Sequence, residues 1–148
     1  MIGIDVGGAN LKVVDGSGAH IHYCPLWKEA PLGDLLSAYA GRGENAAVVM
    51  SGELADSFSG KAEGIGFIVD VVREHFPDAI FYGTDGVFHD RAVPELAAAN
   101  WLASARLTFR ERYPDAVLLD CRHTTGNIIP LATFCDLLEA LPTFYLPV

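Results

Sequence analysis

The chain has 148 residues, of which 51% are hydrophobic and 20% are charged, so it is long enough to bury a core and too apolar to be disordered. Its net charge of -9 argues against a nucleic-acid partner, because such grooves need clustered lysine and arginine. Three cysteines without CxxC spacing, no basic leader and no apolar run of about 20 residues predict a cytoplasmic protein without disulfides or a membrane partner.

Three antiparallel strands are predicted in the first 25 residues. Apolar runs at 1–6, 11–15 and 19–24 are separated by Gly7-Gly8 and by the turn sequence DGSG. Connections this short allow only hairpins, since parallel strands need a long crossover. His20 and His22 alternate along the third strand and so share one face. We expect that face to be solvated, because two histidines make at most half a metal site.

Helices and strands then alternate along the chain. Apolar residues at steps of three and four predict a helix over 61–76, which Pro77 closes. Pro94 is placed to start a long helix over 95–113. The other predicted elements are a helix at 32–41, strands at 46–52, 79–83 and 116–121, a hairpin partner at 124–132 and a short helix at 135–141.

This order of elements predicts a mixed α/β fold. Three antiparallel strands come first, and parallel strands follow because a helix separates each later strand from the next. Helices are expected on both faces of the sheet, and the apolar runs of the parallel strands are expected to be buried on both sides.

The first turn is a candidate phosphate site. A strand that ends near Asp5 and turns through two glycines exposes successive backbone N–H groups, with no side chain to block an anion. Asp5 is placed to hold Mg²⁺ directly or through water, and Lys12 adds a positive charge. The alternative is a hairpin whose glycines only satisfy a positive φ. The candidate phosphate-binding residues here are Gly7, Gly8, Ala9, Asn10 and Lys12.

Five motifs in chain order resemble those of one known family. They are GIDVGGANLK, MSGELAD, KAEG, FYGTDGVF and ELAAANWLASA. Together they resemble the tetrahydromethanopterin-linked one-carbon transfer pathway protein family, a small branch of the hydantoinase A and oxoprolinase group. The resemblance covers residues 1–131 approximately and implies the ribonuclease H-like fold of actin-like ATPases, sugar kinases and heat-shock chaperones. It also implies a first domain over 1–115 and the start of a shortened or degenerate second domain over 116–148.

The resemblance implies a transferase of methanofuran biosynthesis. Such an enzyme joins a furanmethanol diphosphate to the phenol of glutamyl-tyramine and expels diphosphate, so the implied partner is a phosphorylated or diphosphorylated small molecule. The implied cofactor is Mg²⁺, with no organic cofactor. Mg²⁺ and backbone N–H groups would stabilise the negative charge that grows on the leaving diphosphate.

A second phosphate turn follows the strand at 116–121 in this family. Three residues match the family's pattern: Asp120 as a metal ligand, and Thr124 and Thr125 as phosphate-binding residues. Two bulky residues and one amide depart from the pattern, namely Arg122, His123 and Asn127. Because bulky side chains obstruct the approach of a phosphate to the backbone, the alternative here is a hairpin without a ligand.

Two carboxylates follow strands at the edge where open α/β sheets collect ligands. Glu53 is a candidate catalytic base for the phenol, and Asp85 is a candidate catalytic residue facing the same cleft. The alternatives are that Glu53 supports a helix start capped by Ser51, and that Asp85 only forms a turn. Asn100 is expected either to brace a neighbouring backbone or to reach the cleft.

Two other functions are compatible with the same patterns. One is an ATP-using kinase or an oxoprolinase-like enzyme that shares the first turn. The other is a non-catalytic subunit that binds a partner through an exposed sheet edge. A homodimer or a larger assembly is expected, because chemistry with two substrates needs walls on both sides of a cleft.

Overall fold

The computed structural model describes residues 1–28, 30–41, 45–111, 117–121 and 126–130, and at 108–111, 117–121 and 126–130 it describes the backbone. The chain forms two compact units, Met1–Asn100 and Trp101–Val148. The boundary between the units falls earlier in the chain than the boundary at 115 that the resemblance implies. Within the described ranges, no helix combines the length and the apolar character that a membrane span needs.

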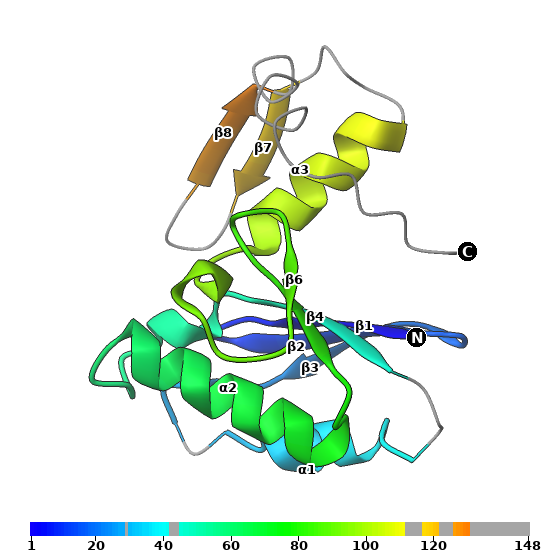
Figure 1. Ribbon diagram of the computed structural model, residues 1–148, viewed down its shortest axis with the longest axis vertical. Coiled ribbons are helices and arrows are strands. Elements are labelled where there is room, and N and C mark those ends of the chain that lie inside the picture. Colours follow the sequence, from blue (N-terminus) through cyan, green and yellow to red (C-terminus); the bar gives the residue numbers. More distant parts are fainter. Residues whose placement is uncertain (29, 42–44, 112–116, 122–125, 131–148) are drawn as a thin grey trace. The chain divides into compact units, whose positions relative to one another are not determined.

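Six strands form the sheet of the first unit (Figure 1). They are β1 (Ile2–Val6), β2 (Asn10–Asp15), β3 (Gly18–Tyr23), β4 (Ala46–Met50), β5 (Ile80–Tyr82) and β6 (Phe88–His89). Their order in the sheet is β3-β2-β1-β4-β5-β6. β2 pairs antiparallel with both β1 and β3. On the other side of β1, β4 pairs parallel with β1 and β5 pairs parallel with β4. The predicted mixed sheet, antiparallel first and parallel afterwards, is confirmed, while β6 was not predicted and pairs antiparallel with β5.

Both α-helices of the first unit lie on one side of this sheet (Figure 1). They are α1 (Leu32–Ser37) and α2 (Lys61–His75), and they lie next to each other. The predicted bounds of α2 are confirmed, since it begins after Gly60 and ends before Pro77. The prediction of helices on both faces is not met by this pair.

The hydrophobic core lies between these helices and one face of the sheet. Alternate residues of β1 and β4 are buried, as are the apolar residues of α2 that recur at steps of three and four. The buried residues of these elements include Ile2, Ile4, Val6, Val48, Met50, Ile65, Ile68 and Val72. Full burial of one such side chain contributes about 1.5–3 kcal/mol to folding.

The opposite face of the sheet is more open than predicted. Gly3 is exposed and Val49 is only half-buried, although both lie in strands next to the centre of the sheet. On β2 and β3 the residues of this face include Val14, Ile21 and Tyr23, which are 54%, 72% and 66% exposed. Burial on both faces was predicted for the parallel strands, and it is found in β5, where the successive residues Phe81 and Tyr82 are both buried, whereas Val49 of β4 is only half-buried. Successive side chains of a strand point to opposite faces, and α1 and α2 pack against one of the two faces.

The long helix predicted over 95–113 is interrupted near its start. The chain forms a single 3-10 turn, η2 (Pro94–Leu96), and a separate helix, α3 (Asn100–Glu111). Between them Ala98 has a φ of 52°, a left-handed conformation that a right-handed helix does not contain. The prediction of one continuous helix is therefore wrong at this residue, although Pro94 does begin a helical turn.

The second unit contains a two-stranded antiparallel sheet. Its strands are β7 (Val117–Cys121) and β8 (Gly126–Pro130), and Asp120 lies opposite Asn127 in their register. The predicted pairing of these two segments as a hairpin is confirmed. The short helix predicted at 135–141 lies outside the described residues.

Candidate functional site

The carboxyl ends of three strands meet at one edge of the sheet, because β1, β4 and β5 are parallel. Residues 7–9 follow β1 and form the first turn, while the 3-10 turn η1 (Gly52–Leu54) follows β4. A Cβ on Gly52 would lie 3.0 Å from the carbonyl oxygen of Gly7 and 3.1 Å from that of Val6. The chain after β4 therefore packs directly against the first turn, at a distance that only glycine allows.

The amides of the first turn divide into bonded and unbonded groups. The amide of Gly7 donates to the carbonyl of Asn10 at 3.0 Å, so it is not available to a ligand. The carbonyls of Gly8 and Ala9 accept from Leu26 and Cys24, which fixes the turn. Among the described residues, no hydrogen bond engages the amides of Gly8 or Ala9. These two N–H groups are the ones left to bind an anion, and a Cβ on Gly8 would meet nothing within 4 Å.

Asp5 and Lys12 form an ion pair beside this turn. They lie opposite each other in the β1–β2 register, and Lys12 Nζ lies 2.6 Å from Asp5 Oδ2. The side chains of Lys12 and Asp5 are 49% and 21% exposed, which leaves the pair accessible from solvent. The other carboxylate oxygen, Asp5 Oδ1, is buried and has no hydrogen-bond partner in the part of the chain that the structure describes. A buried carboxylate oxygen without a partner fits a cation ligand.

The single carboxylate of Asp5 fits Mg²⁺ only when a bound ligand and water supply the other oxygen atoms. In the described ranges, no group of three or more His, Cys, Asp or Glu side chains could hold a metal. Mg²⁺ is commonly bound through one or two carboxylates together with substrate phosphates and water. Asp5 can supply the carboxylate of such a site, and the first turn lies beside it.

Glu53 is buried and holds a distant segment of backbone. Its side chain is 1% exposed, and its Oε1 accepts a hydrogen bond of 2.8 Å from the amide of Ala98. This contact stabilises the left-handed conformation of Ala98 that ends η2. Ser51 is the N-cap residue of η1 and Glu53 lies in its first turn, as the helix-start alternative expected, but no capping bond from the Ser51 side chain to η1 is found. A catalytic role for Glu53 stays a prediction, and the contacts give this carboxylate a positioning role.

Asn100 braces the same region. Its Nδ2 donates to Ser51 Oγ at 3.2 Å, and its residue is 8% exposed. Asn100 therefore contacts a neighbouring side chain, whereas the structural role expected for it was to brace a neighbouring backbone. Ser51 follows β4 directly, so this bond and the bond from Ala98 to Glu53 both connect the end of β4 to residues 98–100.

Asp85 lies in the tight turn between β5 and β6, residues 83–87. Its Oδ1 accepts a hydrogen bond of 3.1 Å from the amide of Val87, so Asp85 does form a turn. Its carboxylate also meets a ring that sequence reasoning missed, since His89 Nε2 lies 3.0 Å from Oδ2 and 3.2 Å from Oδ1. The side chains of His89 and Asp85 are 20% and 36% exposed. The only sequence signal for this pair was the spacing of four residues, and here the hairpin of β5 and β6 brings the two side chains into contact.

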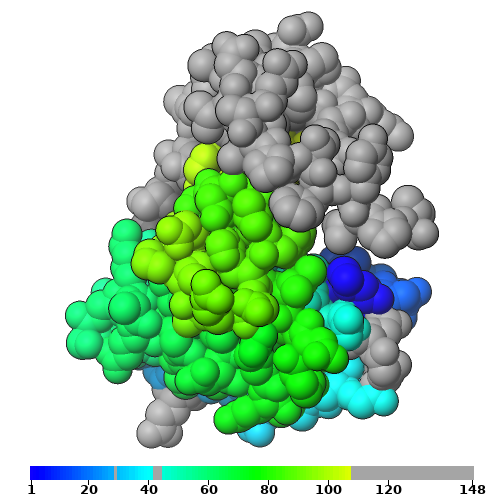
Figure 2. Space-filling view, in the orientation of Figure 1, coloured from blue at the N-terminus to red at the C-terminus, as the bar shows by residue number. Residues whose placement is uncertain are grey.

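The segment that carries this turn lies at the molecular surface. In Figure 2 the residues from β5 to η2, coloured green to yellow-green, occupy much of the visible face of the first unit.

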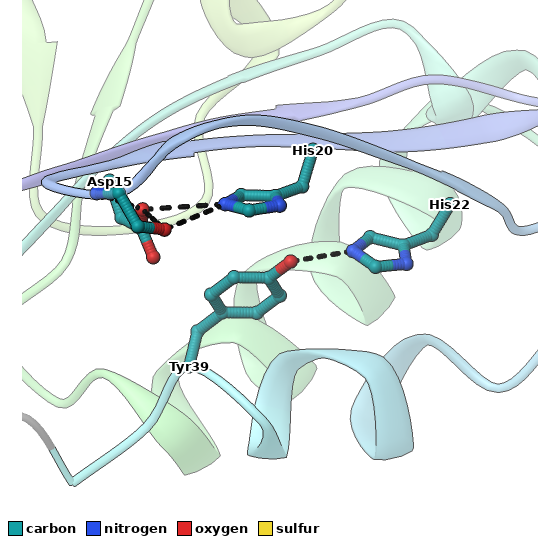
Figure 3. Close-up of polar contacts among 5 residues, drawn as sticks. Asp15, His20, His22 and Tyr39 are labelled. Atoms are coloured by element: carbon teal, nitrogen blue, oxygen red, sulfur yellow. Dashed lines mark hydrogen bonds and ion pairs between the residues drawn. The ribbon is translucent and has the colours of Figure 1, made fainter.

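A second polar cluster lies on β3 and the turn before it (Figure 3). His20 and His22 share one face as predicted, but that face is directed toward Tyr39, which follows α1, so the expectation of a solvated face is wrong. His22 Nε2 lies 2.6 Å from the Tyr39 hydroxyl. His20 Nε2 faces both Ser17 Oγ at 3.1 Å and Asp15 Oδ1 at 3.4 Å.

This cluster is structural. A catalytic triad uses the two ring nitrogens of histidine for two different partners, whereas here one nitrogen of His20 faces both neighbours. Hydrogen bonds from the side chain and the amide of Ser17 lower the pKa of Asp15 to about 2. Asp15 ends β2, so the part of the cluster around Asp15 and Ser17 lies at the edge of the sheet opposite the first turn, while His22 pairs with Leu11 near the first turn.

The remaining predicted site residues belong to the second unit. Asp120 lies within β7, while Thr124 and Thr125 lie outside the described residues. Their roles as a metal ligand and as phosphate-binding residues stay predictions.

No protein-family model matches the chain. A search of curated proteins finds similarity to the (4-{4-[2-(gamma-L-glutamylamino)ethyl]phenoxymethyl}furan-2-yl)methanamine synthase of Methanocaldococcus jannaschii, with 34% identity over 142 residues. The match covers 88% of this chain and 43% of that synthase, so the chain spans less than half of the relative's length. This similarity supports the family that the five motifs predicted.

Proposed function

We propose that this chain takes part in forming an aryl ether between the phenol of glutamyl-tyramine and a furan methylene group, a step of methanofuran biosynthesis. The observation that carries the proposal is the similarity to a synthase whose name contains a phenoxymethyl-furan unit. A phenoxymethyl unit has an oxygen between an aromatic ring and a methylene carbon. The enzyme proposed here makes that bond.

The proposed reaction displaces diphosphate from the furan methylene. The phenol oxygen forms the new bond to carbon, the carbon–oxygen bond to diphosphate breaks with its electron pair, and the phenol proton is released. Negative charge therefore grows on the diphosphate while the phenol loses its proton. The protein must stabilise the negative charge on the diphosphate and accept the proton of the phenol.

The first turn supports the diphosphate part of this reaction. The amides of Gly8 and Ala9 are available to phosphate oxygens, and Lys12 lies within reach of the same turn. Asp5 would hold Mg²⁺ through its buried Oδ1, and the ion when bound would neutralise part of the charge on the departing diphosphate. Lys12 holds the other oxygen of Asp5 and so orients the carboxylate.

A binding assay and an activity assay together test the proposal. The full chain is incubated with glutamyl-tyramine and the diphosphate ester of 5-(aminomethyl)furan-3-methanol, and ether formation and diphosphate release are followed. Ligand binding is read from the rise in melting temperature with Mg²⁺ and inorganic diphosphate. We expect Asp5→Asn to abolish this rise and ether formation. Since an exposed ion pair contributes about 0–1 kcal/mol, the variant should still fold.

Asp34→Asn is the matched control, because Asp34 is an exposed carboxylate on α1. It removes the same charge without touching the first turn, and it should behave as the unmodified chain. Equal responses to diphosphate in Asp5→Asn and in the unmodified chain would contradict the proposed site. Diphosphate binding without any ether formation would contradict the proposed reaction.

A further inference from the structure

The outer edge of β3 has no partner strand within the described residues. β3 comes first in the strand order β3-β2-β1-β4-β5-β6, so it pairs with β2 on one side only. We propose that this edge pairs antiparallel with β3 of a second copy of the chain, which joins two sheets into one across a two-fold axis. The inference goes beyond the proposed reaction and does not depend on it, because it uses no group of the first turn.

The two edges of the sheet differ in how they are protected against other strands. Proteins usually block an exposed edge by keeping its strand short or by placing charges, prolines or bulges there. β6 has two residues, and the side chains of Asp90 and Arg91 that follow it are both 79% exposed. β3 has six residues with the sequence GAHIHY, and its register with β2 runs one-to-one without a bulge. The edge of β3 is therefore long, uncharged and open to pairing.

The charge of the chain restricts where a second copy can bind. With a net charge of -9, two copies repel each other over much of their surfaces. Contact costs least where charge is absent, and β3 contains no lysine, arginine, aspartate or glutamate. The neighbouring Lys12, which lies opposite Ile21 in the β2–β3 register, is already neutralised by Asp5 within its own chain. This edge therefore complements another uncharged strand edge, and β3 of a second copy is one.

The hydrogen bonds beside β3 show which of its backbone groups face outward. The amide of Cys24, the residue after β3, donates to the carbonyl of Ala9 at 2.9 Å, so the backbone groups of Cys24 face the β2 side. In an antiparallel ladder these groups face alternate sides from one residue to the next. Every second residue, counted back from the one before Cys24, therefore directs its N–H and C=O groups away from β2. These outward residues are Ala19, Ile21 and Tyr23.

One register between two copies of β3 uses all the outward residues. With the two-fold axis between the two Ile21 residues, each Ile21 lies opposite the other, and Ala19 of each copy lies opposite Tyr23 of the other. Residues that lie opposite each other with outward groups exchange both of their backbone hydrogen bonds. A register centred on either neighbouring residue would set one outward residue against a residue outside β3. The axis at Ile21 therefore gives the most complete pairing.

The side chains on the open face of the sheet fit this register. Ile21 and Tyr23 are 72% and 66% exposed, and they lie on the face of β3 opposite the two histidines that point toward Tyr39 (Figure 3). The two Ile21 side chains would meet at the axis. The ring of Tyr23 would lie over the small Ala19 of the other copy, toward Val14, which is next to Ala19 in the β2–β3 register and is 54% exposed. The pairing thus covers apolar side chains that one chain leaves in water.

The proposed contact closes on itself. A two-fold contact uses the same strand in both copies, and it leaves only the short β6 edges at the ends of the joined sheet. A contact limited to one strand edge belongs to the small interfaces of less than about 1,200 Å², which are typical of weak complexes. We therefore expect a dimer whose dissociation constant is roughly micromolar.

Analytical ultracentrifugation of the full chain between about 1 μM and 1 mM tests the assembly. We expect the unmodified chain to dimerise within this range. Ile21→Lys sets two lysines against each other at the axis, and it should raise the dissociation constant about 100-fold or more. Because Ile21 is 72% exposed, the variant should still fold. Leu107→Lys is the matched control, since it adds the same charge at a residue of α3 that is 63% exposed, and it should dimerise as the unmodified chain does.

Amide hydrogen exchange identifies the edge that pairs. In the dimer the amides of the outward residues should be protected, and they should exchange freely on dilution to the monomer and in Ile21→Lys. The amides of His20 and His22 face β2 and should stay protected in both states. A dimer formed through another surface would leave the outward amides unprotected.

Three results would each overturn this inference. They are a monomer at every concentration, a dimer that Ile21→Lys does not weaken, and free exchange of the Ile21 amide in the dimer. Tyr23→Lys, measured in the same series, replaces Ile21→Lys if thermal melts show that the latter does not fold. None of these results bears on diphosphate binding or ether formation, so the proposed function is tested separately.

Discussion

Two glycines of α2 should respond in opposite ways to the same substitution. A Cβ on Gly64 would lie 2.5 Å from the carbonyl oxygen and 2.7 Å from the Cα of Glu53, both backbone atoms. A Cβ on Gly66, two residues along the same helix, would meet nothing within 4 Å. Gly64→Ala and Gly66→Ala therefore add the same methyl group, and only the first forces the backbone of η1 to move.

The magnitudes follow from two opposing terms. Alanine is favoured over glycine inside a helix by about 1 kcal/mol, which stabilises both variants. Overpacking against immobile atoms costs about 1–3 kcal/mol, and two backbone contacts this short require the upper end of that range. We expect Gly66→Ala to raise the free energy of unfolding by about 1 kcal/mol and Gly64→Ala to lower it by about 2 kcal/mol.

Urea denaturation followed by circular dichroism measures both values under the same conditions. For a unit of this size, a change of 1 kcal/mol corresponds to a shift of about 4–8 °C in melting temperature, so thermal melts give an independent check. If Gly64→Ala were as stable as Gly66→Ala, the close contact between α2 and Glu53 would be wrong.

Two further predictions concern acid stability and the first turn. Because the pKa of Asp15 is lowered to about 2 in the folded protein from 3.8, its contribution to stability is present above about pH 4 and is lost as the pH falls toward 2. Ser17→Ala should flatten this loss in urea denaturation measured across that range, and an unchanged pH dependence would contradict the assignment. Gly52→Ala would place a Cβ against Leu26 Cδ1 and 3.0 Å from the carbonyl oxygen of Gly7, so it should displace the first turn. We expect Gly52→Ala to need at least tenfold more diphosphate, in the presence of Mg²⁺, for the same rise in melting temperature. Gly8→Ala should need a smaller increase, because a Cβ on Gly8 meets nothing within 4 Å.

The parts of the fold that were predicted correctly depend on contacts between near neighbours in the chain. The hairpins of β1, β2 and β3 follow from turns too short for any other connection, and α2 follows from its apolar spacing between Gly60 and Pro77. The helix expected over 95–113 failed for the opposite reason. Its interruption at Ala98 depends on a hydrogen bond to Glu53, a residue 45 positions away.

By itself, the sequence determined the mixed α/β order, the glycines of the first turn and the five motifs that indicate the family. Only the tertiary structure decided which groups of the candidate site are accessible. It buried Glu53 and brought His89 against Asp85 in a hairpin, and within the described residues it bonded the amide of Gly7 but not those of Gly8 and Ala9. Burial and hydrogen-bond partners depend on segments that meet in space from distant parts of the chain, and no local pattern encodes them.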